Sequence, residues 1–176
     1  VKDKDGRVFD KKRSKFRQIN RFLELLSEAA SFDKSKELYV LDLCCGKSYL
    51  SFAAYHYFTE VLHRNVKMTG VDLKPDVVAY CNEVAKKLNF GGLEFLCGDV
   101  NKYECGEHVH LVISLHACDI ATDYAINYAL SRRVEHIFSV PCCQHEVNSA
   151  IHKGGDLDIL LKYGIIKERM SALLTD

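Results

Sequence analysis

Three acidic residues stand at or near the ends of apolar runs in this sequence. Asp42 lies near the end of the run 39–43, Asp72 ends the run VKMTGVD, and Asp99 follows the run LEFLCG. After the first run, Gly46 predicts a turn, and the residues that follow it can form a helix. Such a strand–turn–helix junction directs backbone N–H groups at an anionic ligand group. Acids at consecutive strand ends suit a nucleoside-containing ligand lying across the edge of a parallel sheet.

S-adenosylmethionine (SAM) is the ligand that these residues fit best. The turn at Gly46 offers N–H groups to the methionine carboxylate, because glycine has no side chain to block close approach. Asp42 is the candidate partner of the ammonium, directly or through water, and Asp72 of the ribose hydroxyls. Asp99 is placed to accept from the adenine amino group, while Val100 packs on the ring. The remaining cofactor candidates are Cys44, Ser48, Tyr49 and Leu73, which are close to these positions in the sequence, and Leu115 at the end of the fourth expected strand.

Two other interpretations of this region stay open. Each acid taken singly could cap a turn or the next helix, and Cys44 and Cys45 could simply pack within the first turn. A nicotinamide dinucleotide would call for a G-x-G-x-x-G turn against its pyrophosphate. The corresponding stretch, C-C-G-K-S-Y, contains one glycine. The joint order of the acids therefore favours SAM over a dinucleotide.

A methyl acceptor should lie beyond the carboxyl ends of the central strands. His116 and Asp119 follow the fourth expected strand, and Cys142 and His145 follow the fifth. Methyl transfer from a sulfonium is an in-line displacement that aligns a nucleophile with the methyl group and sometimes removes a proton. An imidazole can take that proton near neutral pH. We therefore predict that these four residues form the catalytic group.

The same segments also allow a zinc interpretation. Cys142, Cys143 and His145, joined by Cys118 or His116, supply suitable ligand types. However, the side chains of adjacent cysteines point apart, and the sequence has no C-x-x-C pair. We therefore predict no metal site, and packing of the thiols against the end of the sheet is the alternative to a catalytic role.

Strand and helix patterns alternate along the chain. An amphipathic helix is expected over about 14–30, strands near 39–43, 67–72, 93–97, 110–115 and 136–140, and helices near 48–63, 75–88, 121–131 and 156–174, the last interrupted by Gly164. This order predicts an α/β fold with a mostly parallel, Rossmann-like sheet and helices on both faces. We divide the chain into a basic N-terminal helix leading into the core (1–35) and a SAM-binding core (36–176).

Composition is that of an ordinary globular chain. The 176 residues are 48% hydrophobic and 27% charged, with zero formal net charge, and no apolar stretch approaches the roughly 20 residues of a membrane helix. Eight cysteines without an export signal predict reduced thiols and a cytoplasmic location. Residues 2–21 contain nine Lys or Arg against three Asp, which could be a solvated helix or an edge that contacts phosphates.

Four segments together carry a resemblance to a known family. DLCCGKSYLSFA, GVDLK, SLHACDIATD and VPCCQHE look like SAM-dependent methyltransferases of the "methyltransferase domain 32" type, over roughly residues 14–175. KFRQINRF (15–22) is similar to a stretch in bacterial members. That likeness implies that Lys15 and Gln18 lie on a helix closing over the methionine end, with surface positions as the alternative. The family domain would continue with two more strands, so we expect a class I core that lacks them and is a piece of a longer protein.

The acceptor is less constrained than the cofactor. The PCC-x-H segment is similar to one in eukaryotic enzymes that methylate a ribose hydroxyl of the tRNA acceptor stem, although their zinc-finger segments are absent from this sequence. This resemblance and the basic N-terminal stretch make RNA a candidate acceptor, beside a small molecule or a protein. The alternative function is a non-catalytic module of the same fold that binds RNA or a protein.

Overall fold

The computed structural model describes residues 13–29, 32–33, 36–115, 117–141, 144–152, 154–155 and 158–175. His116, Cys142 and Cys143 lie outside the described residues. Along the chain the elements are α1 (Arg13–Ala29), β1 (Leu38–Leu43), α2 (Tyr49–His56), the π-helix η2 (Tyr57–Val61), β2 (Val66–Asp72), α3 (Pro75–Lys87), β3 (Leu93–Cys97), β4 (Leu111–Ser114), α4 (Ile120–Ser131), β5 (His136–Ser139), α5 (His145–Ala150), α6 (Asp158–Leu161) and α7 (Gly164–Thr175).

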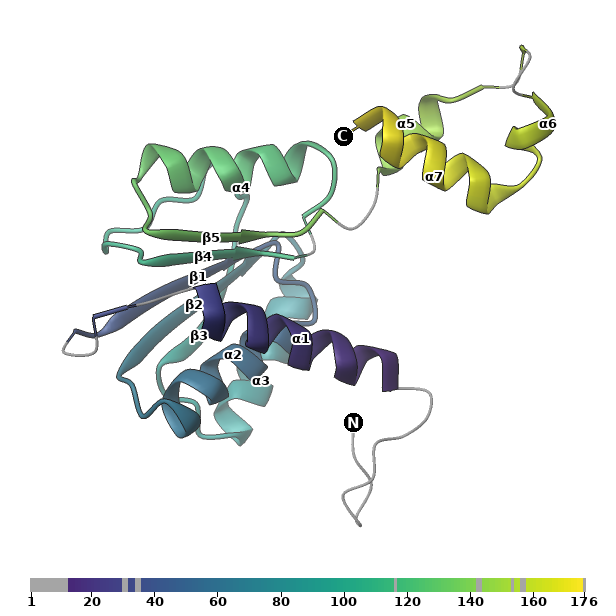
Figure 1. The fold of residues 1–176 in the computed structure, drawn as a ribbon. Coiled ribbons are helices and arrows are strands. Elements are labelled where there is room, and N and C mark those ends of the chain that lie inside the picture. The colour runs from purple at the N-terminus through teal and green to yellow at the C-terminus, as the bar shows by residue number, and fades with distance from the viewer. Residues whose placement is uncertain are drawn as a thin grey trace.

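The five strands form one parallel sheet in the order β3-β2-β1-β4-β5 (Figure 1). The order reverses at β1, whose neighbours β2 and β4 lead away in opposite directions. Ligands of open α/β sheets bind at such a switch point, outside the carboxyl ends of the strands. The predicted α/β class and parallel sheet are confirmed, and five strands are present in the described part of the chain.

Helices cover the two faces of the sheet unequally. On one face α1, α2 and α3 pack against the strands around Phe58, Met68 and Phe95. On the other face α4 packs over β4 and β5, and its Tyr128 belongs to one buried cluster with Leu43 of β1. The connection from β3 to β4 (98–110) contains no helix. The connection packs on Leu41 and Val71 through Val100 and Val109, so the second face is open only around Tyr39, Lys67, Thr69 and Glu94. The expectation of helices on both faces did not anticipate this gap.

Some elements differ from the sequence-based expectation. The helix expected over 48–63 is α2 followed by η2, in which Leu62 N–H donates to Tyr57 O (3.0 Å). The helical stretch expected over 156–174 consists of two helices, α6 and α7. The break between them falls just before Gly164, which is the first residue of α7. The short helix α5 was not expected, because its sequence, HEVNSA, is too short and polar for apolar periodicity.

The C-terminal helices stand apart from the sheet (Figure 1). Neither α5 nor α6 contains a buried residue. In α7 Ser171 is buried, whereas Ile165, Leu173 and Leu174 are exposed. No helix in the described ranges combines the length and apolarity that crossing a membrane demands.

Candidate functional site

The turn after β1 lies at the switch point and has an unusual backbone. Cys44, Gly46 and Ser48 have φ angles of 59°, 53° and 54°, a left-handed region that non-glycine residues rarely adopt. Cys45 N–H donates to Val71 O (3.1 Å), and Ser48 N–H donates to Cys45 O (2.9 Å). The turn is thus closed on itself and attached to β2, and it delivers Tyr49 as the first residue of α2.

Asp72, the last residue of β2, fastens this turn from the other side. Its Oδ2 accepts from Gly46 N–H (2.8 Å), and its Oδ1 accepts from Lys74 N–H (3.0 Å). The Gly46 N–H that we expected to meet a methionine carboxylate therefore already meets a carboxylate of the chain. Each Asp72 oxygen keeps a second lone-pair site, so the group can still accept from ribose hydroxyls. The structure brings Asp72 and Gly46 together, and their roles in binding stay predictions.

Asp42 lies beneath the turn and not at the open edge. It is 4% exposed, and its carboxylate accepts a hydrogen bond from Ser51 of α2. Burial raises the pKa of Asp42 to about 7, against the lowering effect of that hydrogen bond. Contact with a ligand ammonium is therefore confined to a small exposed surface or to a bridging water. Ser51 was not singled out from the sequence, because only the packing of α2 on β1 brings it to Asp42.

The adenine candidates lie at the end of β3. Asp99 Oδ1 accepts from Asn101 N–H (3.0 Å), as in a turn-capping aspartate. Val100 is buried in the core beside α4. Leu115, after β4, is buried on the opposite face, whereas Leu73 is 67% exposed. Of the two residues predicted to bind adenine, Asp99 is therefore partly accessible and Val100 is buried. Of the two further cofactor candidates, Leu73 is at the surface and Leu115 is not.

Helix α1 reaches this region from the N-terminal side. Lys15 Nζ donates to Gln18 Oε1 (3.1 Å) and lies 5.6 Å from the centre of the Tyr49 ring. A cation at that distance from an aromatic ring is attracted to its face. Three predicted cofactor residues, Lys15, Gln18 and Tyr49, are thus brought together beside the turn.

Comparisons with known proteins identify the family of this chain. Residues 14–150 match the model of a protein family described as a methyltransferase domain. The chain belongs to this family. It matches none of the curated proteins with which it was compared. The match includes the turn after β1, Asp72, Asp99 and the whole of α5.

Solved structures with the same fold include a Methanococcus maripaludis protein assigned to the SAM-dependent methyltransferases, with 13% identity and a TM-score of 0.52, covering 70% of this chain and 54% of that one. The 23S rRNA methyltransferase ErmE has 16% identity and a TM-score of 0.51, covering 69% and 42%. The [4+2]-cyclase SpnF has 16% identity and a TM-score of 0.52, covering 66% and 41%. The methyltransferase domain spans between 41% and 54% of their lengths. The likeness shows the class I methyltransferase fold, on which a cyclase is also built.

The residues predicted to face a methyl acceptor follow β4 and β5. Asp119, with φ 52° and ψ −134°, precedes α4, and its Oδ1 accepts from Glu146 N–H (3.3 Å). This contact places the start of α5, including His145, near the start of α4. His145 also lines a hollow of about 400 Å³ between α5 and α7, with Gln144, Asn148 and Glu168. Asp119 and His145 thus lie close in space, because Asp119 contacts the residue after His145. His116 and Cys142 lie outside the described residues.

Two serines at this edge were missed in the sequence analysis. Ser114 and Ser139 end β4 and β5 and are partners in the strand register. The hydroxyl of each is buried without a hydrogen-bond partner among the residues that the structure describes. The available signal was that two apolar strands, LVIS and HIFS, both end in serine.

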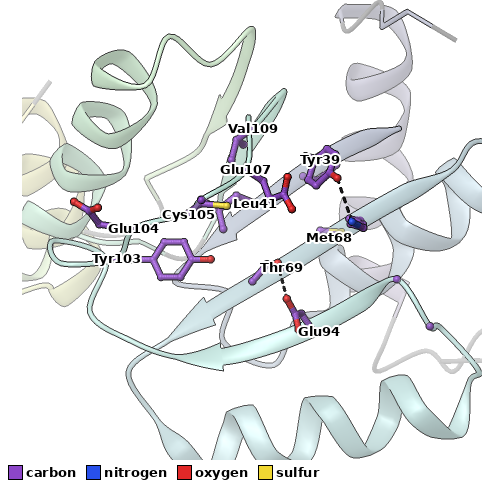
Figure 2. A pocket seen from close by; sticks show the side chains of 15 residues that line it. Tyr39, Leu41, Met68, Thr69, Glu94, Tyr103, Glu104, Cys105, Glu107 and Val109 are labelled. Atoms are coloured by element: carbon purple, nitrogen blue, oxygen red, sulfur yellow. Dashed lines mark hydrogen bonds between the residues drawn. The ribbon is translucent and has the colours of Figure 1, made fainter. Parts of the chain in front are cut away.

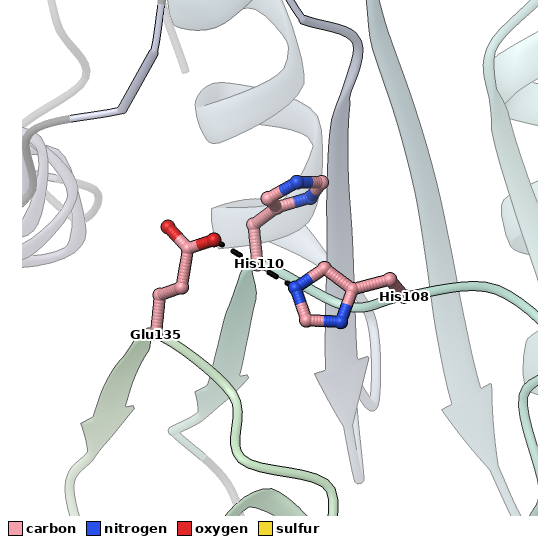
Figure 3. Close-up of side chains that lie close together, drawn as sticks. All are labelled: His108, His110 and Glu135. Atoms are coloured by element: carbon pink, nitrogen blue, oxygen red, sulfur yellow. Dashed lines mark ion pairs between the residues drawn. The ribbon is translucent and has the colours of Figure 1, made fainter.

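One group in the described residues has metal-ligand types, at the opposite edge of the sheet. His108, His110 and Glu135 precede β4 and β5, and His108 Nε2 lies 3.7 Å from Glu135 Oε1 (Figure 3). However, Tyr39 N–H donates to His110 Nδ1 (3.1 Å). A neutral imidazole that accepts at Nδ1 carries its proton on Nε2, so His110 has no free lone pair for a metal. Burial also lowers the pKa of His110 and favours this neutral form.

Proposed function

We propose that this methyltransferase domain binds SAM at the turn between β1 and α2 and transfers its methyl group to RNA. The observation that carries the proposal is Asp72, because this acid at the end of β2 is fastened to the Gly46 turn inside the matched region. Each of its oxygens keeps a lone pair that could accept from a ribose hydroxyl. Lys15 and Tyr49 border the same turn and could enclose the methionine end.

The first test is calorimetric titration of the chain with SAM, S-adenosylhomocysteine and NADH in parallel. Binding of the two adenosyl ligands with dissociation constants on the order of micromolar, without a response to NADH, is the expected result. Binding of NADH alone would reject the cofactor assignment and favour an oxidoreductase.

For the reaction itself, Asp119 and His145 are the described members of the predicted catalytic group. SAM supplies the methyl group when bound, and the chain aligns an acceptor with it. A neutral His145 could receive the proton of an acceptor hydroxyl or amine as the new bond forms. Replacing His145 by Ala should leave cofactor affinity nearly unchanged and lower turnover. Weakened cofactor binding with unaltered turnover would reverse this assignment.

RNA is favoured as the acceptor by the charge of α1. Arg13 and Arg17 are exposed on the helix whose Lys15 lies beside the Gly46 turn, so a phosphate backbone could follow α1 towards the cofactor. The structurally similar ErmE is a 23S rRNA methyltransferase. Affinity for RNA should fall with added salt. In R13Q/R17Q the slope of log affinity against log salt concentration should be smaller, by the amount expected for the loss of about one to two phosphate contacts. The control K86Q/K162Q removes two exposed lysines elsewhere, and an equal effect there would contradict a specific role for α1.

A non-catalytic module of this fold is the second candidate. It is favoured by the acceptor side, where α5 and α6 bury no residue against the sheet. Binding of S-adenosylhomocysteine without methyl transfer to any RNA, protein or small-molecule pool would support this candidate over the enzyme.

A further inference from the structure

The open face of the sheet contains a hollow that is separate from the candidate cofactor site. Tyr39, Lys67, Thr69 and Glu94 line it from β1, β2 and β3, and part of the connection 98–110 forms its wall (Figure 2). Its volume is about 440 Å³, within the range of about 300–1,000 Å³ typical of ligand pockets. Parallel sheets are normally covered on both faces. This face is therefore a surface on which another molecule can complete the second layer.

The charges of the hollow are predominantly negative. Its lining includes three glutamates, Glu94, Glu104 and Glu107, and one basic residue, Lys67. Lys67 Nζ is already engaged, because it donates to Tyr39 Oη (3.1 Å) and lies 3.5 Å from Glu37 Oε2.

Two of the three glutamates keep an unbalanced charge. Glu104 lies 3.6 Å from Arg132 Nη2. By contrast, Glu94 and Glu107 have no ion-pair partner within the described ranges, and Glu94 accepts only from the Thr69 hydroxyl (3.3 Å). The hollow thus offers two carboxylates to an incoming cation.

The shape and the side chains of the hollow favour a cation on an aliphatic chain. Figure 2 shows Glu94 and Glu107 on opposite sides, with Thr69 between them and the ring of Tyr103 at one end. Gly91 and Gly92 also line the hollow, and the space on the side-chain position of Gly91 is empty, which leaves room for another main chain. Lysine and arginine combine an apolar stem, which can pack on tyrosine rings, with a charged head.

We propose that this hollow docks a basic peptide segment of a partner protein, with a lysine or arginine head between Glu94 and Glu107. Charge complementarity selects this occupant, because the same carboxylates repel the phosphates of RNA. The proposal is independent of the cofactor site, since none of the lining residues belongs to the Gly46 turn. Partner binding here and RNA binding along α1 would use opposite charges on different parts of the domain.

The test is fluorescence anisotropy with a short labelled peptide of alternating lysine and alanine, added to the complete chain at low salt. The variant E94Q/E107Q removes the two unbalanced carboxylates and keeps their shape. The control E28Q/E60Q removes two exposed carboxylates from α1 and η2, so that both variants have the same net charge. We expect E94Q/E107Q to weaken peptide binding at least about ten-fold, as expected for loss of a charge-assisted contact, and the control to change it less than about two-fold. Binding of S-adenosylhomocysteine should be the same in all three proteins.

Three outcomes would overturn the proposal. Equal weakening in both variants would mean that the peptide responds only to overall charge. Unchanged peptide binding in E94Q/E107Q would mean that the peptide binds elsewhere on the domain. In that case the amide chemical shifts of Thr69, Gly91 and Gly92 should not change when the peptide is added. Tighter binding of spermine than of the peptide, with the same dependence on Glu94 and Glu107, would assign the hollow to a free polyamine instead of a protein segment.

Discussion

Asp72 links the backbone of the candidate site to its chemistry. Its two oxygens hold Gly46 N–H and Lys74 N–H, so the same carboxylate that is expected to bind ribose also positions the turn after β1. Cys44 and Ser48, the two non-glycine residues of the turn with left-handed backbone angles, lie on either side of Gly46, and the Asp72 contact is one of those that hold this turn in place. The cost of an unfavourable backbone conformation is of order 1–3 kcal/mol per residue and is tolerated when surrounding contacts impose it. A change at Asp72 should therefore affect both the turn and the ligand.

Replacing Asp72 by Ala should weaken binding of S-adenosylhomocysteine by about 1–3 kcal/mol, because hydrogen bonds to a charged group are lost. Calorimetric titration measures this effect directly. Asp76→Ala is the matched control, since Asp76 is an exposed acid in the first turn of α3 and should leave the affinity unchanged. If Asp72→Ala binds as tightly as the natural chain, Asp72 has no role at the ribose.

Asp42 predicts a dependence of stability on pH. Its pKa is raised to about 7 by burial, so the folded state keeps a proton that the unfolded state releases near pH 4. The folded state then binds more protons between these values, and the free energy of unfolding falls as pH rises from about 4 to about 7. One pKa unit corresponds to about 1.4 kcal/mol, which makes the total effect on the order of a few kcal/mol.

Urea denaturation at a series of pH values tests this prediction. Asp42→Asn keeps an oxygen for Ser51 and has no proton to lose, so its stability should rise relative to the natural chain as pH increases. The difference should level off above about pH 8. A constant difference between the two proteins across this range would show that Asp42 titrates normally.

At the scale of elements, α3 protects the exposed edge of the sheet. β3 is the edge strand, and the Asn82 side chain of α3 accepts from Phe95 N–H (2.9 Å) and donates to Phe95 O (2.7 Å). The amide of Asn82 thus replaces one residue of a neighbouring strand. Unpaired edge strands invite association with other chains, and this contact blocks the middle of β3.

Asn82→Ala should lower the free energy of unfolding by about 1–2 kcal/mol, because two hydrogen bonds of about 1 kcal/mol each are lost. It should also increase self-association in sedimentation velocity at high protein concentration. Lys86→Ala, one helical turn later on the exposed side of α3, is the control and should be nearly neutral. A variant as stable and as monodisperse as the control would remove Asn82 from edge protection.

The elements differ in how well the sequence predicts them. β1 and β4 are apolar runs buried on both faces, so their composition alone identifies central strands of a parallel sheet. The π-helix η2 escaped prediction because a shift of one residue in backbone hydrogen bonding leaves little trace in side-chain periodicity. The short helix α5 lacks an apolar stripe altogether.

The candidate site was predictable only in part. Asp72 and Gly46 could be chosen because parallel strands must end at one edge. The pairing of Asp42 with Ser51 could not, because it depends on the distance at which α2 packs on β1. Lys15 and Gln18 came from a family resemblance, and no periodicity in α1 by itself indicates that its N-terminal turn meets Tyr49.

The whole molecule combines a well-packed sheet with a C-terminal group of helices that has little buried surface. The core around β1, β2 and β4 includes Leu43, Val71 and Leu111, all fully buried. In α5, α6 and α7 the one buried residue among those described is Ser171. Burial of apolar side chains is the main source of stability, so the two regions should open at very different free energies.

Hydrogen exchange followed by mass spectrometry should therefore separate α7 from α3, two helices of nearly equal length. α3 buries Val78, Cys81 and Ala85 against the sheet, and its amides should exchange only when much of the core opens. α7 should exchange through local opening, faster by about two orders of magnitude or more, since local free energies range from near zero to the global value. Equal protection of the two helices would mean that the exposed Ile165, Leu173 and Leu174 are covered in solution. If the protection of α7 then rose with protein concentration, the molecule that covers these side chains would be a second copy of the chain.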